Sequence, residues 1–335
     1  MKYNREELLR VLEAVSPGLA IKEAIEQSSC FVFLQGEVAT FNDEVACVMP
    51  MTSFTDEEIA VPAKPLMDLL RKLAENEIDI ELIANELVIK GKKRRAGITC
   101  EAEVALPIGS VDRPEVWNAL DPEFTDAVGV VQQCASRDQN QFHLTCIHLT
   151  PEYIEACDNF QMVRYPIPME IEESCLVKRD SLKHVMGLGM IEVSETGTWM
   201  HFRNGAGLVL SVRREILDYE DLTAILEVTG DKTTLPGGLA EAVEKAEVFS
   251  AENSENNVVF IELRKGKLRI RGVGVSGWYE ERKDVKWMGE PLSFSIAPNL
   301  LVEITNRTND CYITPGRLMV DGGKFTYVTC LGKVE

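Results

Sequence analysis

The sequence predicts an α+β fold built from three tandem repeats, each with two helices packed on antiparallel sheet. The same order of elements occurs three times along the 335 residues. Each copy has an amphipathic helix, two or three strands, a second helix and a closing pair of strands. The second helix begins near Ala63, Lys178 and Ala297, at intervals of 115 and 119 residues. Such a period is the length of a domain rather than of a solenoid repeat. We therefore expect domains at 1–118, 119–228 and 229–335.

The first repeat opens with an amphipathic helix. Asn4 suits the N-cap and Glu7 the capping-box position, while apolar residues between Leu8 and Val15 form one stripe. Pro17-Gly18 ends the helix. The second helix is predicted at 61–73. Strands with alternating or continuous apolar residues are predicted at 30–42 (two strands and a turn), 44–49, 78–83 and 86–90.

The second and third repeats follow the same order. In the second, we expect helices at 124–135 and 177–186 and strands at 142–149, 153–157, 199–202 and 208–212. In the third, we expect helices at 239–249 and 296–305 and strands at 258–263, 267–271, 311–314, 317–320 and 325–329. A strand at the edge of one repeat can pair with the next repeat, which hides both edges.

Composition restricts the function. The net charge of −19 opposes ordinary nucleic-acid binding, because phosphate contacts need Lys and Arg. A protein that encircles DNA, however, needs a favourable potential only on its inner surface. No apolar run approaches the ~20 residues that span a bilayer, and the charged start predicts no signal peptide. The nine cysteines lack a CxxC pair, so we expect small buried residues in a reducing cytoplasm rather than disulfides or zinc.

Enzymatic motifs are missing from the sequence. The four histidines lack HExxH or other ligand spacing, and there is no GxSxG or P-loop. Gly272–Gly277 resembles GxGxxG, but no helix start follows it, so a loop is predicted there. We expect no catalytic residue, no metal and no cofactor.

Several phrases, in order, resemble the bacterial DNA polymerase III beta subunit, the beta sliding clamp family. Asn85-Glu-Leu-Val-Ile-Lys and Lys265-Gly-Lys-Leu-Arg-Ile match its recurrent turn-strand phrases. Tyr153–Met162 is similar to its Ala-Thr-Asp-Gly-x-Arg-Leu segment, Arg214–Leu222 to its Gly-x-Phe-Pro-Asp-Tyr stretch, and Phe325–Glu335 to its C-terminal Tyr-Val-x-Met-Pro-Met-Arg-Leu.

The chain departs from these phrases in ways that mark a divergent member. Ala-Thr-Asp-Gly is replaced by Ala156-Cys-Asp-Asn159, Phe-Pro-Asp-Tyr by Ile216-Leu-Asp-Tyr219, and Met-Pro-Met-Arg-Leu by Cys330-Leu-Gly-Lys-Val334. The fold is therefore transferred more safely than the choice of partner.

The resemblance implies a ring. Two chains would close head-to-tail around duplex DNA as a homodimer, with the helices lining the hole. The ring would act as a processivity factor that tethers a polymerase, and its partners would be double-stranded DNA, DNA polymerase, the clamp loader and a second copy. A closed ring cannot dissociate sideways, so weak, sequence-independent phosphate contacts would suffice and would let it slide.

The resemblance also suggests which cations face DNA. Lys22 and Arg137 lie where the family carries DNA contacts. The third domain's first helix is acidic, with Glu241, Glu244 and Glu247, and should contribute little attraction. The candidates on or near the six helices are Arg5, Arg10, Lys22, Arg71, Lys72, Arg137, Lys178, Arg179, Lys183, Lys245 and Arg307.

A partner groove would lie between the second and third domains. In the family it accepts a short peptide with Gln, Leu and Phe anchors, and apolar pockets with a Met suit such peptides. Leu for Pro at 217 and Cys for Met at 330 would reshape it. The predicted lining is Leu144, Cys157, Phe160, Met162, Leu217, Leu222, Arg317, Val328 and Cys330.

Dimer-interface candidates are Val248 and Phe249 at the end of a helix, together with an edge strand around Ile98 and Cys100. Ordinary core packing is the alternative for both sets. For the whole protein, two alternatives stay open: a clamp-fold interaction or regulatory protein that binds replication partners without encircling DNA, and a hydrolase, for which the sequence offers no acid, base and nucleophile.

Overall fold

The structure is a computed structural model that describes residues 1–335 except 53, 56, 228–229, 253–256 and 334–335. The described chain divides into two compact units. Unit 1 comprises Met1–Gln132, Cys146–Tyr153 and Ile167–Leu217, and unit 2 comprises Gln133–Thr145, Ile154–Pro166 and Asp218–Glu335. The predicted boundary between the second and third domains, at 228 and 229, lies outside the described residues, and the three-domain division remains a prediction.

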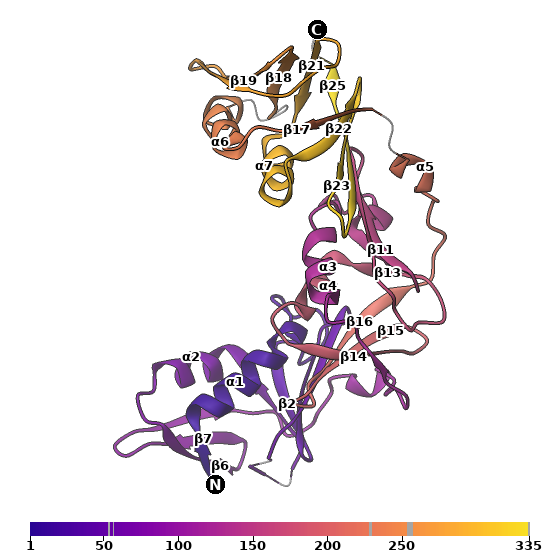
Figure 1. Cartoon of the computed structure of the whole chain (residues 1–335). Helices are drawn as coiled ribbons and strands as arrows, with labels where there is room; N and C mark the ends of the chain where they lie inside the picture. Colours follow the sequence, from indigo (N-terminus) through magenta and orange to yellow (C-terminus); the bar gives the residue numbers. More distant parts are fainter. Residues whose placement is uncertain (53, 56, 228–229, 253–256, 334–335) are drawn as a thin grey trace. The chain divides into compact units, whose positions relative to one another are not determined.

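The N-terminal part of unit 1 has two helices beside a four-stranded sheet. The helices are α1 (Arg5–Val15) and α2 (Ala63–Lys72), and they pack side by side (Figure 1). The Asn4 side chain accepts hydrogen bonds from the backbone N–H groups of Glu6 and Glu7, which confirms the predicted cap. The sheet has the order β1 (Lys2–Asn4), β6 (Glu77–Ile83), β7 (Glu86–Lys90) and β8 (Arg95–Thr99), so β8 is an edge strand.

A larger antiparallel sheet completes unit 1. Its main strands, in spatial order, are β10 (Cys146–Leu149), β13 (Cys175–Lys178), β16 (Val209–Glu215), β4 (Val45–Pro50), β3 (Glu37–Phe41), β2 (Cys30–Leu34) and β5 (Ile59–Pro62). Strands β14 (Met190–Glu195), β15 (Trp199–Asn204) and β9 (Asn118–Ala119) continue it beside β16. Because β4 of the first repeat pairs with β16 of the second, the expected pairing between repeats is confirmed.

Unit 2 repeats the arrangement with one helix pair and two sheets. Helices α6 (Leu239–Ser250) and α7 (Pro298–Arg307) lie side by side, and α6 packs on one sheet (Figure 1). That sheet has the order β20 (Trp278–Asp284), β19 (Lys267–Val273), β18 (Val259–Arg264), β21 (Leu292–Ile296) and β25 (Gly332–Lys333).

The second sheet of unit 2 contains another junction between repeats. Its order is β17 (Asp231–Thr234), β22 (Asp310–Thr314), β23 (Arg317–Asp321), β24 (Thr326–Cys330), β12 (Gln161–Pro166) and β11 (Tyr153–Cys157, of which Tyr153 belongs to unit 1). Strand β12 of the second repeat pairs antiparallel with β24 of the third. The α+β class with antiparallel sheets is confirmed.

Some predicted elements were wrong in detail. The strand expected at 142–149 begins as a 3₁₀ turn, η3 (Phe142–Thr145), because the Thr145 hydroxyl donates to the Phe142 carbonyl at 2.7 Å and turns the chain. The helix expected at 124–135 is shorter, α3 (Phe124–Val131), and the one expected at 177–186 is a single turn, α4 (Arg179–Leu182), followed by η4 (Lys183–Val185). Strand β20 was not predicted, because its outer side chains are charged and conceal its alternation.

Three further features bear on the chemistry of the chain. All nine cysteines are free thiols, and seven are buried like small apolar residues, while Cys157 is half-buried and Cys330 exposed. Among the described residues, no group of three or more His, Cys, Asp or Glu could hold a metal ion. Within the same part of the chain, every helix is too short or too polar to cross a membrane.

Candidate functional site

Unit 2 contains a groove where β11, β12 and β24 meet. Met162 on β12 lies opposite Val328 on β24, and both side chains are buried. Leu222 and Met319 join them in one apolar cluster, against which Cys157, Tyr219 and Leu226 pack. Alternate residues of neighbouring strands share a face of the sheet, so this cluster forms a continuous apolar floor.

The groove above this floor has a volume of about 570 Å³. Phe160 lies at its rim with 66% of its surface exposed, an unusual position for a large aromatic side chain. Its lining is Gln141, His143, Leu144, Cys157, Asp158, Asn159, Phe160, Gln161, Met162, Asp218, Tyr219, Glu220, Leu222, Ile225, Arg317, Val328 and Cys330.

One wall is a strap formed by residues 218–226, which ends in the single-turn helix α5 (Thr223–Leu226). A polar network ties the strap to the sheet. Arg164 Nε donates to the buried carboxylate of Glu155 at 2.7 Å, and Arg164 Nη1 donates to Thr223 Oγ1 at 3.1 Å. Asp221 Oδ1 accepts from the Thr223 backbone N–H at 2.9 Å. The hydrogen bond from the Thr223 side chain, followed by the one from this N–H, lowers the pKa of Asp221.

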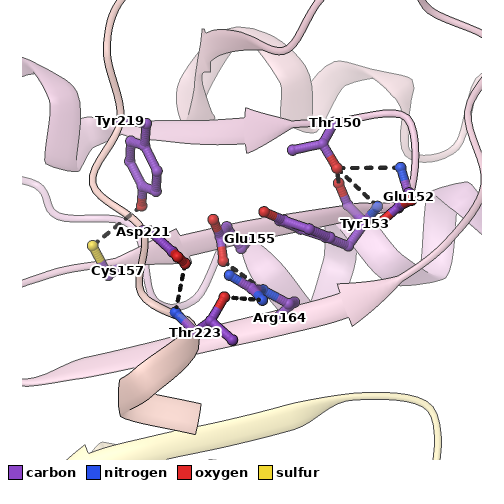
Figure 2. A network of polar contacts seen from close by, with 9 residues as sticks. All are labelled: Thr150, Glu152, Tyr153, Glu155, Cys157, Arg164, Tyr219, Asp221 and Thr223. Carbon is purple, nitrogen blue, oxygen red and sulfur yellow. Dashed lines mark hydrogen bonds and ion pairs between the residues drawn. The ribbon is translucent and has the colours of Figure 1, made fainter.

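Figure 2 shows this network beside the Cys157–Tyr219 contact, in which Sγ and Oη are 3.2 Å apart. Burial raises the pKa of the Cys157 thiol, so it stays protonated near neutral pH and acts as an apolar wall rather than a nucleophile. In the same view, Thr150 Oγ1 donates to the Tyr153 carbonyl at 2.8 Å and accepts from the Tyr153 N–H, which closes the turn before β11.

Another part of the rim is the tight turn between β11 and β12. Asp158 Oδ1 accepts from the backbone N–H groups of Phe160 and Gln161, at 2.7 and 2.9 Å. Gln161 Oε1 accepts from the Tyr327 hydroxyl at 2.9 Å, which ties the turn to β24. These bonds fix the backbone and hold the Phe160 ring at the surface.

The structure brings together eight of the nine predicted groove residues, and Leu217 is the exception. Leu217 is 51% exposed and is the last residue of unit 1. The sequence did not reveal Tyr219, Ile225, Gln141 or His143 as lining residues. The first two belong to the strap, His143 belongs to η3, which was predicted as strand, and Gln141 comes just before η3.

The predicted DNA-facing cations fall into two groups. Arg10, Lys22, Lys72 and Arg137 are exposed, and no ion pair involving them is found in the described structure. The others are engaged within the fold. Arg5 is the clearest case: its side chain is 12% exposed and donates to the carbonyls of Leu70 and Glu75, at the end of α2.

The remaining cations have acidic or aromatic neighbours. The ion pairs are Arg71–Glu13 at 3.0 Å, Lys178–Glu44 at 2.5 Å, Arg179–Asp180 at 3.1 Å, Lys183–Asp180 at 3.2 Å and Lys245–Glu281 at 3.9 Å. Arg307 lies over the Phe325 ring, 5.9 Å from its centroid. The more exposed of these pairs still attract phosphate, although less strongly than a lone cation does, whereas the Arg179 side chain is only 15% exposed.

The predicted interface residues are mostly packed inside their own units. Ile98 and Cys100 are buried, and Ile98 lies on the edge strand β8. Phe249 is half-buried, with its ring against Gly277, whereas Val248 is 67% exposed. Only Val248 therefore presents a large apolar surface to solvent.

Comparison with known proteins identifies the fold. The chain has the fold of bacterial DNA sliding clamps along its whole length. The DNA polymerase III beta chain from Streptococcus pneumoniae TIGR4 is 15% identical, covers 99% of each chain and has a TM-score of 0.87. The beta subunit from Thermotoga maritima and the Pseudomonas aeruginosa sliding clamp bound to griselimycin are each 16% identical, cover 100% of this chain and 99% of their own, and have TM-scores of 0.85.

No protein-family model matches the chain, and no curated protein matches it by sequence. The similarity therefore establishes the fold, and the low identity agrees with the divergent phrases noted in the sequence.

Proposed function

We propose that this chain is a DNA sliding clamp, a non-enzymatic processivity factor that encircles duplex DNA in the cytoplasm and tethers a polymerase. The observation that carries the proposal is an open groove of about 570 Å³ with an apolar floor, at a strand junction in a chain with the sliding-clamp fold. A fold alone does not define a function, but a groove with a buried floor is a surface that a partner's side chains can fill.

The proposal requires a closed ring, which we infer to be a head-to-tail homodimer. Strand β8 is the edge of a sheet in unit 1 and β20 the edge of a sheet in unit 2, so each can add a strand from a second copy. Exposed Val248 would support this contact. Light scattering should give about 75 kDa, twice the 37.4 kDa of one chain. A monomer at micromolar concentration would contradict the ring.

DNA should be held by topology rather than affinity. Exposed cations such as Lys22 and Arg137 would give weak, salt-sensitive phosphate contacts. Protein loaded on a nicked circular plasmid should co-elute with it in gel filtration, and a single cut in the plasmid should release the protein. Equal retention on circular and linear plasmid would refute encirclement.

A matched pair of variants separates DNA contact from net charge. Lys22→Glu with Arg137→Glu should reduce loading, whereas Lys2→Glu with Lys286→Glu, which makes the same change at exposed positions of the same two units, should not.

The groove would bind the polymerase and the clamp loader through short peptides. Burying one Leu and one Phe side chain yields roughly 3–6 kcal/mol before ordering costs. Micromolar affinity needs about 8 kcal/mol, so hydrogen bonds and further contacts along the groove would have to supply the remainder. A regulatory protein that uses the groove without encircling DNA would bind such a peptide and still fail the plasmid test.

A further inference from the structure

The outer face of one sheet in unit 2 is cationic in a chain whose net charge is −19. Leu263 on β18 and Leu268 and Ile270 on β19 are buried on the face that α6 covers. Alternation in a strand puts their neighbours on the opposite face. The strand register places Arg264 opposite Lys267, and Arg269 opposite Arg282, across β18, β19 and β20.

These side chains surround a hollow of about 370 Å³. Its lining is Arg264, Lys265, Lys267, Arg269, Arg282 and one carboxylate, Glu262. Arg264, Lys267 and Arg282 are each about two-thirds exposed, at 71%, 65% and 67%. A surplus of cations over carboxylates in a concave surface attracts a polyanion, and the acidic remainder of the chain would direct the polyanion to this face.

Carboxylates hold the guanidinium groups in place without using all their donors. Glu262 pairs with Arg264 and, at 3.2 Å, with Arg269. Glu280 pairs with Arg282 at 3.1 Å and with Arg269 at 3.8 Å, and Asp284 pairs with the Lys267 ammonium. Each guanidinium has five N–H donors, of which one carboxylate engages at most two. The remaining donors can bind phosphate oxygens, for which arginine is the preferred side chain.

An aromatic platform continues the cationic row. Arg271, two residues beyond Arg269 on β19, lies 5.6 Å from the ring centroid of Trp278, and that indole is 61% exposed. A cationic track beside an exposed aromatic ring is the combination that holds single-stranded nucleic acid, because the cations contact phosphates and the ring stacks on a base. An acidic peptide would need the cations but not the ring.

We propose that this outer face, formed by β18, β19 and β20, binds the phosphate backbone of single-stranded nucleic acid. The face is separate from the groove at β12 and β24, and its binding requires no ring. The test of this activity is therefore independent of the test of the proposed clamp function.

The test is fluorescence anisotropy of a labelled oligo(dT) 20-mer with the full chain. If about four phosphates are contacted, the logarithm of the affinity should fall with the logarithm of salt with a slope near −3, or about sixty-fold between 50 and 200 mM salt. Lys265→Glu with Lys267→Glu should weaken binding more than tenfold, and Trp278→Ala should weaken it several-fold.

The matched control makes the same charge change on the hairpin turn of unit 1. Lys92 and Lys93 are exposed beside β8, and Lys92→Glu with Lys93→Glu should leave binding within about twofold. Equal losses in both variants would show a net-charge effect and overturn the proposal. Tighter binding of poly-glutamate, equal binding of a duplex 20-mer, or no binding at 50 mM salt would each overturn it too.

Discussion

Two junctions between successive repeats use the same strand pairing, yet only one carries a large groove. In unit 1, β4 pairs antiparallel with β16, and in unit 2, β12 pairs antiparallel with β24. Each junction has a linker beside it: residues 104–117 in unit 1 and the strap 218–226 in unit 2. The cavities differ, at about 220 Å³ in unit 1 and about 570 Å³ in unit 2.

The linker of unit 1 inserts into the core. Leu106 is 4% exposed and belongs to one apolar cluster with Phe41 and Trp199, against which Val104 and Ile108 pack. The remaining cavity is partly polar, because His201, Ser211 and the Arg203 guanidinium line it. Arg203 lies 4.3 Å from the centroid of the Trp117 ring, which covers one side.

The strap of unit 2 is held by polar contacts instead. Arg164 joins Glu155 to Thr223, and this fixes the strap at its α5 end while Leu222 alone is buried in the floor. The comparison shows that the linker, rather than the strand pairing, decides whether a junction is closed. A linker with buried apolar side chains fills the space at the junction, whereas a linker held by polar contacts leaves room for a partner's side chains.

The largest expected loss of stability comes from removing the Arg164 side chain, which holds the strap to the sheet. Arg164→Met would leave the Glu155 carboxylate, which is 1% exposed, without its cation. Removing one partner of a buried ion pair costs about 3–5 kcal/mol. We expect the free energy of unfolding from urea titration to fall by that amount and peptide affinity to fall with it.

The control variant also removes the negative charge of Glu155. Arg164→Met combined with Glu155→Gln should recover at least half of the lost stability, because the remaining amide is neutral. A single variant that stays within 1 kcal/mol of the parent would mean that the strap depends on its apolar contacts, as the unit 1 linker does.

A somewhat smaller effect should follow from opening the closed junction. Leu106→Ala removes a buried side chain and should lower the free energy of unfolding by about 2–4 kcal/mol. It should not change peptide affinity. Leu226→Ala, in the strap, is the matched change: this side chain is only half-buried, so the loss should be about 1 kcal/mol, accompanied by weaker peptide binding. Weaker peptide binding in Leu106→Ala but not in Leu226→Ala would contradict the distinction between the two linkers.

Peptide binding itself is the next test. Met162→Ala or Leu222→Asp should weaken a peptide of the Gln-x-x-Leu-Phe type by more than about tenfold, or 1.4 kcal/mol, in calorimetry. Both side chains form the groove floor. Glu57→Ala, an exposed change in unit 1, should have no effect. A normal dimer that binds no such peptide would mean that Cys157 and Cys330 have re-specified the groove.

The sequence predicted the floor of this groove and several residues of its rim, but of the strap only Leu222 was predicted. Met162 and Val328 lie in strands whose apolar residues are visible in the sequence, and the phrase around Tyr153–Met162 aligned them with the family. The strap could not be placed, because residues 218–226 have no regular period and are held by Arg164 and Glu155, which are distant in sequence. Long-range polar contacts leave no periodic signal.

The same limit applies to β20 and to the cations. Strand β20, Trp-Tyr-Glu-Glu-Arg-Lys-Asp, alternates between two polar faces, so the hydrophobic pattern that reveals strands is missing. Arg5 was predicted to face DNA because it is basic and on a helix, whereas its guanidinium satisfies carbonyls at the end of α2. Whether a cation is paired within the fold depends on acceptors that only the tertiary structure brings close to it.

The smallest expected effect is a loss of stability as the pH falls, and it should arise at the junction of unit 1 rather than at that of unit 2. His201, beside the closed junction, is fully buried between the Thr196 and Ser211 hydroxyls, at 2.9 and 2.8 Å. Burial, followed by the charge of Arg214, lowers its pKa to about 4. In the unfolded chain the pKa is about 6.5. Between these values the unfolded state binds a proton that the folded state does not, so stability is lost as the pH falls from about 6.5 to about 4.

Between pH 7 and pH 5.5 this one group should remove about 1 kcal/mol of the free energy of unfolding. The range stays above the isoelectric point of about 4.8, so the protein keeps its negative charge. His201→Gln preserves a side chain that can hydrogen-bond both hydroxyls but does not titrate. The difference between the two unfolding curves therefore isolates the histidine. Parallel curves would show that folding does not lower the pKa of His201. Peptide affinity in unit 2 should be the same for both proteins at either pH.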